Sequence, residues 1–320
     1  MYCYKNGSYL VMILDDGTKI RYNKLNMYKP DRVESMDIKI TNCCDMGCLM
    51  CHENSTFDGK HCDYGNALNL IGKIPPYTEL AIGGGNPLSY PHLVDLLGKC
   101  KNRNLIANIT VNKYHFIQNF KWIYNLYIYN YIKGIGISVF DITDEEIELI
   151  KKVNGVCHTI IGVTPIEVMK KLADNNVKVL VLGYKNFRRG EKHYQDFKNE
   201  IDTSINIWSD FITKAIQEQY YSVISFDNLA IKQLKLKEKL STEEWDSFFM
   251  GDDGIDGEFS SASMYIDLVE QKFALNSCAP LDERYNCKDF NNDVNKMFSF
   301  LYIIIKIFTI ISFIKWSTTI

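Results

Sequence analysis

The sequence predicts an α/β fold: a partial TIM-like (β/α)6 barrel that follows an N-terminal β-hairpin and precedes an α+β C-terminal extension. Apolar, β-rich runs alternate with helix-length segments, and six such runs follow one another. Strand, helix and strand in strict order predict a parallel sheet with right-handed crossovers. The predicted strands are residues 36–41, 79–83, 106–112, 134–140, 159–163 and 177–184.

The intervening segments carry apolar residues at helical spacing. Two of them also begin with helix-start signals: Thr143 with Glu146 forms a capping box, and Thr164 precedes Pro165 at the first helical position. The predicted helices are residues 91–103, 115–129, 143–153 and 165–175.

We divide the chain into four parts. Residues 1–33 form a hairpin cap, with strands at 9–14 and 18–22 joined by an Asp-Gly turn. Residues 34–190 form the barrel core. Residues 191–297 form the extension, where the composition shifts to longer helical segments and a hairpin-like stretch. Residues 298–320 form a hydrophobic tail.

The composition is that of an ordinary globular protein. Of the 320 residues, 46% are hydrophobic and 23% are charged, and the formal net charge is -3. This charge gives no general attraction to nucleic acid or anionic lipid. The basic stretches 185–198 and 232–239 are interleaved with acids and are interpreted as solvated helix faces, so there is no nucleic-acid signal.

The chain has ten cysteines, and residues 1–24 lack the continuous apolar region of a signal peptide. We therefore expect a reducing, cytoplasmic location, with thiols that are free or metal-bound.

Three of the cysteines carry the most specific signal. Cys44, Cys48 and Cys51 follow the first predicted strand at C-x3-C-x2-C spacing. Three thiolates on one loop can hold three irons of a cubane cluster and leave the fourth iron open. A non-catalytic zinc site or a purely structural iron-sulfur site is the alternative. The zinc site would be completed by residues near the motif: Cys43, His52, His61 or Cys62. Cys43 could also replace Cys44, but the spacing favours Cys44.

The second predicted strand runs into the turn Gly83-Gly84-Gly85-Asn86-Pro87, where the absence of side chains lets the backbone approach a ligand. The cysteines and this turn both lie at C-terminal strand ends of adjacent units. They are therefore expected to face one pocket.

At these residues the chain resembles the radical S-adenosylmethionine (radical SAM) superfamily, over about residues 34–190. The motifs are Cys44-Asp-Met-Gly-Cys48-Leu-Met-Cys51 and the Gly84-Gly85-Asn86-Pro87 turn, together with the six strand-helix units. The resemblance implies a partial barrel that holds a [4Fe-4S] cluster. The amino and carboxylate groups of S-adenosylmethionine would chelate the open iron.

The resemblance also implies binding roles for further residues. Gly84, Gly85, Asn86 and Pro87 would contact the amino group of S-adenosylmethionine. The family more often has Glu where Asn86 stands, so the acceptor is kept and a negative charge is lost. Met50 stands where the family usually has an aromatic residue near the adenine.

Three strand residues complete the set. Asn112 and Ser138 match positions that contact the ribose or the methionine carboxylate, although Asn112 could instead cap a helix and Ser138 could be a small core residue. Ile161 matches the apolar strand against the adenine. Pro165 stands near the place of a Glu that often follows in the family.

The implied activity is one-electron chemistry. Reductive cleavage of S-adenosylmethionine gives a 5′-deoxyadenosyl radical that abstracts hydrogen from a substrate. An external electron donor of the flavodoxin or ferredoxin kind is then required. The sequence identifies no substrate, and no catalytic residue beyond the cluster ligands is named.

Two C-terminal features leave alternatives open. Cys278 and Cys287 could contribute to a second metal centre, but two cysteines are few, and inert or zinc-type thiols are the preferred interpretation. Residues 298–316 are nearly all apolar and long enough to cross a bilayer. Lys306 near the middle argues against insertion, and the Ile, Phe and Thr content favours β structure or a helix docked on the barrel, so membrane contact of the tail is one of two alternatives.

Overall fold

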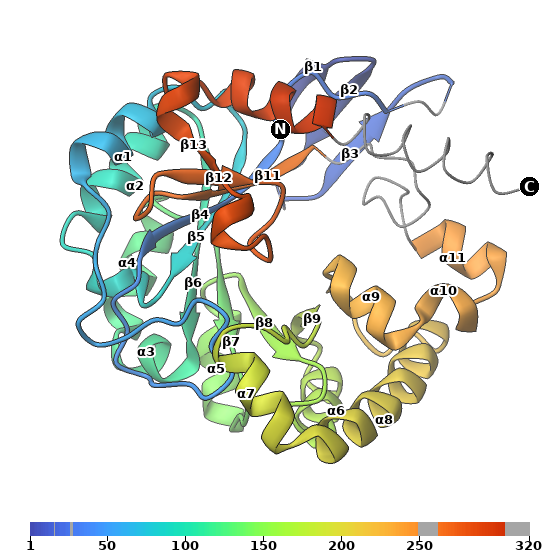
Figure 1. The fold of residues 1–320 in the computed structure, drawn as a ribbon. Coiled ribbons are helices and arrows are strands. Elements are labelled where there is room, and N and C mark those ends of the chain that lie inside the picture. Colours follow the sequence, from blue (N-terminus) through green and yellow to red (C-terminus); the bar gives the residue numbers. More distant parts are fainter. Residues whose placement is uncertain (16, 26–27, 249–261, 305–320) are drawn as a thin grey trace, which may run out of the picture.

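A ten-stranded, mostly parallel sheet dominates the computed structural model, which describes residues 1–15, 17–25, 28–248 and 262–304 (Figure 1). Its strand order is β10-β9-β8-β7-β6-β5-β4-β11-β12-β13. The six central strands run parallel in chain order: β4 (Ser35–Thr41), β5 (Glu79–Gly84), β6 (Ile106–Asn112), β7 (Gly134–Ser138), β8 (Gly155–Ile160) and β9 (Lys178–Leu182). The predicted α/β class is confirmed.

The sheet is open within the described residues, because β10 (Ile224–Phe226) and β13 (Tyr285–Asn286) each pair with one neighbour and not with each other. The extension supplies both edges. β10 pairs with β9, while β11 (Ser263–Asp267) runs parallel to β4 and leads into β12 (Lys272–Ala274). The predicted hairpin of the extension is therefore part of the main sheet.

Helices follow the strands and lie along the outer side of the sheet (Figure 1). Apolar residues that alternate along each strand, such as Ile82, Ile109 and Val179, are buried against them. The helices are α1 (Tyr64–Ile71), α2 (Leu93–Asn102), α3 (Lys113–Gln118), α4 (Phe120–Ile128), α5 (Asp144–Lys151), α6 (Ile166–Asp174), α7 (Arg189–Asp196), α8 (Lys198–Gln217), α9 (Asn228–Leu234), α10 (Leu236–Lys239) and α11 (Thr242–Phe248), with 3-10 turns η1 (Pro87–Ser89), η2 (Leu281–Glu283) and η3 (Cys287–Phe290).

Three local predictions differ from the structure. The strand predicted at 159–163 is β8, four residues earlier, because the chain turns at Gly162, where φ is +76°. The helix predicted at 115–129 is two helices that meet at Asn119. Thr164 does not cap α6, because its hydroxyl accepts from the Ile160 amide and donates to the Val139 carbonyl. The capping box of Thr143 and Glu146 is confirmed.

The N-terminal residues form a separate three-stranded antiparallel sheet of β1 (Tyr2–Asn6), β2 (Tyr9–Ile13) and β3 (Lys19–Tyr22). The predicted hairpin corresponds to β2 and β3. Glu34, fully buried just before β4, joins this sheet to the core. It accepts from Asn6 at 2.8 Å and Tyr9 at 2.5 Å and lies 3.0 Å from Arg21.

Only the start of the predicted tail lies within the described residues. Residues 294–304 are helical, and Phe298 and Leu301 are buried in the core. Phe300 packs against the rings of Phe273, Tyr285 and Phe290. Residues 305–320, including Lys306, lie outside the described part. In the described part, no helix has the length and apolar character needed to cross a membrane.

The buried carboxylate of Glu34 should make the unfolding free energy fall in acid. Burial alone would raise the pKa of Glu34, but Arg21, Tyr9, Lys19 and Asn6 hold it below its ordinary value of 4.5. Because the folded pKa is the lower one, the charged carboxylate contributes its full stability above about pH 4.5 and loses it as the pH falls through the folded pKa. We expect Glu34→Gln to flatten the decline of unfolding free energy from pH 5 to pH 3, measured with urea. Equal declines in both proteins would contradict this assignment.

Candidate functional site

The three motif cysteines lie together on the loop that follows β4, which we call the cysteine loop (residues 42–62). Cys44, Cys48 and Cys51 are half-buried. Burial raises the pKa of the Cys44 thiol, and the charges of Cys48 and Cys51 raise it further. Burial and the charge of Cys51 likewise raise the pKa of Cys48, and the positive charge of Arg189 opposes them. The three motif cysteines thus share one partly buried stretch of the loop.

Cys43 has a different environment. Its thiol donates to the Phe57 carbonyl at 3.2 Å, and its backbone forms an isolated bridge with Thr56. It therefore closes the base of the cysteine loop. The choice of Cys44 over Cys43 as the first ligand stays a prediction from the spacing, and the bonds of Cys43 give that residue a structural role.

The glycine turn lies directly on the start of the cysteine loop. The Gly85 amide donates to the Thr41 carbonyl and the Asn86 amide to the Cys43 carbonyl, each at 2.7 Å. A Cβ atom on Gly85 would lie 2.3 Å from the Cys43 oxygen, and one on Gly84 2.4 Å from the Thr41 oxygen. Gly84 also has φ of +113°. No side chain can therefore be accommodated at either position.

The other predicted residues of this turn are partly used by the fold. The Asn86 side chain accepts from the Leu88 amide at 3.1 Å and so caps η1, while Pro87 is buried at its first position. A carbonyl oxygen has a second lone pair, so the Asn86 side chain can still accept from a ligand amine.

A row of polar side chains crosses the inner face of the sheet. Asn112, Ser138 and His158 pair in register on β6, β7 and β8, and all are half-buried. Asn112 also caps α3, because its side chain accepts from the Tyr114 amide at 2.9 Å. In-register residues on parallel strands share a face, so these three side chains lie side by side at the ends that carry the cysteine loop.

His158 is not among the residues predicted from the sequence. Its ring covers Gly136, where a Cβ would lie 2.3 Å from the imidazole, and burial lowers its pKa to about 4. The alternation of apolar and polar residues in 155–160 could have revealed it, but the strand was predicted four residues too late.

The remaining predicted ligand contacts differ in accessibility. Ile161 is fully buried in the core, whereas Ile160 belongs to the half-buried inner face. Met50 is half-buried at the edge of the core. The structure thus brings the cysteines, the glycine turn, Asn112 and Ser138 to the C-terminal ends of the parallel strands. It places the side chain of Ile161 in the interior.

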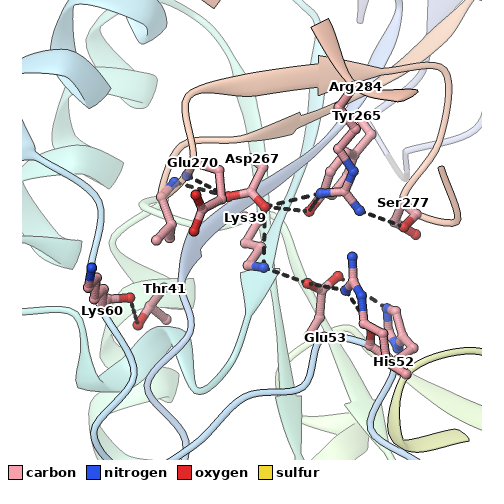
Figure 2. Close-up of polar contacts among 12 residues, drawn as sticks. Lys39, Thr41, His52, Glu53, Lys60, Tyr265, Asp267, Glu270, Ser277 and Arg284 are labelled. Atoms are coloured by element: carbon pink, nitrogen blue, oxygen red, sulfur yellow. Dashed lines mark hydrogen bonds and ion pairs between the residues drawn. The ribbon is translucent and has the colours of Figure 1, made fainter. Parts of the chain in front are cut away.

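A buried ion network connects the cysteine loop to the extension (Figure 2). Lys39 of β4 lies 2.8 Å from Glu53 of the loop and 3.2 Å from Asp267 of β11. Arg284 contacts Asp267 at 3.1 Å and donates to the Ser277 carbonyl. Burial alone would raise the pKa of Glu53, but His52 and Lys39 hold it far below its ordinary value.

The residues proposed for a zinc site are used elsewhere. His61 bonds the Thr41 hydroxyl at 2.8 Å, His52 lies against Glu53, and Cys62 is buried. Among the described residues, no three His, Cys, Asp or Glu side chains are placed to share one metal ion. Cluster cysteines each bind a different iron, so they lie farther apart than ligands of a single ion.

The two C-terminal cysteines occupy unlike environments. Cys278 is exposed, whereas Cys287 is buried, and burial raises the pKa of its thiol to about 12. Cys287 is therefore suited to packing as a small apolar residue. All ten cysteines of the chain are free thiols.

The chain has matches among solved structures. No protein-family model and no curated protein match the chain. Three solved structures of SuiB from Streptococcus suis do. The complex with the precursor peptide SuiA has a TM-score of 0.55 at 13% identity, and the complex with S-adenosylmethionine 0.54 at 14%.

The chain has the fold of SuiB. A third SuiB structure matches with a TM-score of 0.51. Each match covers 84% of this chain but only 65–66% of SuiB, so the chain spans about two thirds of the length of its structural neighbour. The likeness confirms the α/β fold with its large parallel sheet.

Gly85 tests the packing of the two loops. We expect Gly85→Ala to lower the unfolding free energy by about 1–3 kcal/mol, because the new methyl group would collide with the backbone carbonyl of Cys43. Gly98→Ala in α2 is the matched control. Its Cβ would lie 3.6 Å from Tyr131, and alanine favours the helix by about 1 kcal/mol. Equal stability of the two variants in urea would show that the contact is not tight.

Asp267 tests the ion network. Asp267→Asn keeps the acceptor that caps residues 269 and 270 but removes the charge between Lys39 and Arg284. We expect a loss of about 3–5 kcal/mol on urea unfolding. Asp282→Asn, at an exposed position nearby, should change stability by less than about 0.5 kcal/mol. A loss no larger than that of the control would refute the role of the network.

Proposed function

We propose that the protein is a radical SAM enzyme whose cluster is held by Cys44, Cys48 and Cys51. One observation carries this proposal: three half-buried cysteines lie on a loop that the glycine turn fixes at the C-terminal ends of the parallel strands. The fold shared with SuiB, which has been crystallised with S-adenosylmethionine, supports it. In this proposal the six central units form the partial (β/α)6 barrel of the family.

The residues present fit a [4Fe-4S] cluster. Burial and mutual repulsion raise the pKa of Cys44 and Cys48, so the thiolate forms need positive charge beside them, which iron provides. When bound, the cluster supplies the electron for cleavage of S-adenosylmethionine to the 5′-deoxyadenosyl radical, which then takes hydrogen from the substrate. The chain contributes the three sulfurs, their fixed spacing and shielding from water.

The cofactor residues are proposed in three groups. The turn Gly84-Gly85-Asn86-Pro87 would receive the amino group of S-adenosylmethionine, with the Asn86 carbonyl as acceptor. Met50 and Ile161 would lie near the adenine, and Asn112 and Ser138 would contact the ribose or the carboxylate. Asn112 and Ser138 are half-buried and lie side by side at the C-terminal strand ends, which supports their proposed role. Ile161 is buried, so the neighbouring Ile160 presents the accessible apolar surface.

Partners follow from this chemistry. A flavodoxin- or ferredoxin-like protein would deliver the electron. A peptide is the first substrate class to test, because a SuiB structure holds its precursor peptide SuiA, while small-molecule substrates stay open. A cytoplasmic location stays a prediction from the sequence, and no disulfide between the ten cysteines argues against it. Membrane contact of the tail, residues 298–320, stays a prediction, because residues 305–320 lie outside the described part.

The test compares two neighbouring cysteines after anaerobic loading with iron and sulfide. We expect Cys48→Ala to bind much less iron and to form no 5′-deoxyadenosine from S-adenosylmethionine under dithionite, because one of three ligands is gone. Cys43→Ala, which removes only the bond to Phe57, should keep the cluster and the cleavage. The measurements are iron per chain and chromatography of 5′-deoxyadenosine. Zinc in place of iron in the purified wild type, or cleavage by Cys48→Ala, would contradict the proposal.

A further inference from the structure

The basic stretch 185–198 is not simply a solvated helix face. Its first arginines turn toward the cysteine loop. Arg188 donates to the His52 carbonyl at 2.5 Å, and Arg189 donates to the Ser55 carbonyl. A Cβ atom on Gly190 would lie 3.6 Å from the Met50 oxygen, which is ordinary van der Waals contact. The first turn of α7 is therefore packed on residues 50–55, on either side of Cys51.

The backbone fixes both arginines in this position. Arg188 precedes α7 with φ of +54° and ψ of −127°, a combination that non-glycine residues rarely adopt. Such a residue costs about 1–3 kcal/mol and persists where its surroundings hold it. The Tyr184 hydroxyl, which donates to the Gly190 carbonyl at 2.8 Å, provides part of that hold.

The two guanidinium groups differ in charge balance. Arg188 lies 3.6 Å from the Glu53 carboxylate and is thereby partly neutralised. Arg189 forms no ion pair with any carboxylate in the described part of the chain, and its buried Nε atom has no hydrogen-bond partner there. Arg189 thus brings a positive charge and one unused N–H group to the loop that carries the three cysteines.

We propose that Arg189 raises the reduction potential of the cluster held by Cys44, Cys48 and Cys51, and so eases its one-electron reduction. This inference rests on the proposed function. Reduction adds one negative charge to the cluster and changes no covalent bond. A fixed cation in a partly desolvated site stabilises the more negative state, and hydrogen bonds toward the sulfurs act in the same direction.

The experiment measures the midpoint potential of the reconstituted protein by anaerobic titration with dithionite, followed by electron paramagnetic resonance. We expect Arg189→Gln to have a clearly lower potential than the wild type. Arg189→Lys, which keeps the charge, should stay near the wild type. Lys192→Gln, which removes a charge from the exposed side of the same helix, should leave the potential unchanged.

The outcomes separate the two proposals. A wild-type protein that takes up no iron refutes the proposed function itself. A wild-type cluster whose potential is the same in Arg189→Gln refutes only the role of Arg189. If Arg189→Gln binds too little iron for titration, Arg189→Lys decides: a potential near the wild type supports the charge effect, and a clear fall overturns it.

Discussion

The backbone contact between the glycine turn and the cysteine loop is the constraint on which the rest of the site depends. The amides of Gly85 and Asn86 bond the carbonyls of Thr41 and Cys43, so the ends of β4 and β5 fix where the loop begins. The same two carbonyl oxygens would lie only 2.4 Å and 2.3 Å from a Cβ atom on Gly84 and Gly85, which explains why glycine stands at both of these positions. The loop that presents the three thiols therefore starts from a rigid base.

Buried ion pairs hold the part of the cysteine loop around Glu53. The far half of the loop is held by side chains from three separate parts of the chain: Lys39 in the core, Asp267 in the extension through Lys39, and Arg188 after β9. Removal of one partner from a buried ion pair strongly destabilises a protein, because it leaves an unpaired buried charge. The core, the cysteine loop and the extension therefore depend on one another for stability. The extension is thus a structural part of the site, although it lies outside the region of family resemblance.

Much of this organisation could be predicted from the sequence. Alternation of apolar runs and helical segments gave all six central strands, and the spacing of Cys44, Cys48 and Cys51 indicated a cluster loop at a strand end. Contacts between distant segments could not be predicted: the pairing of β11 with β4 and the turn of Arg188 and Arg189 toward the loop depend on tertiary packing. A strand displaced by four residues hid His158 for a local reason, the turn at Gly162.

The central claim is that three thiolates leave one iron open for S-adenosylmethionine. The most direct measurement is the electron paramagnetic resonance spectrum of the reduced, reconstituted protein before and after S-adenosylmethionine is added, with iron counted in the same sample. We predict about four irons per chain, as for one [4Fe-4S] cluster, and a spectrum that changes when the ligand binds the open iron. An unchanged spectrum at full iron loading would mean that a fourth protein ligand closes the cluster, and would contradict the account.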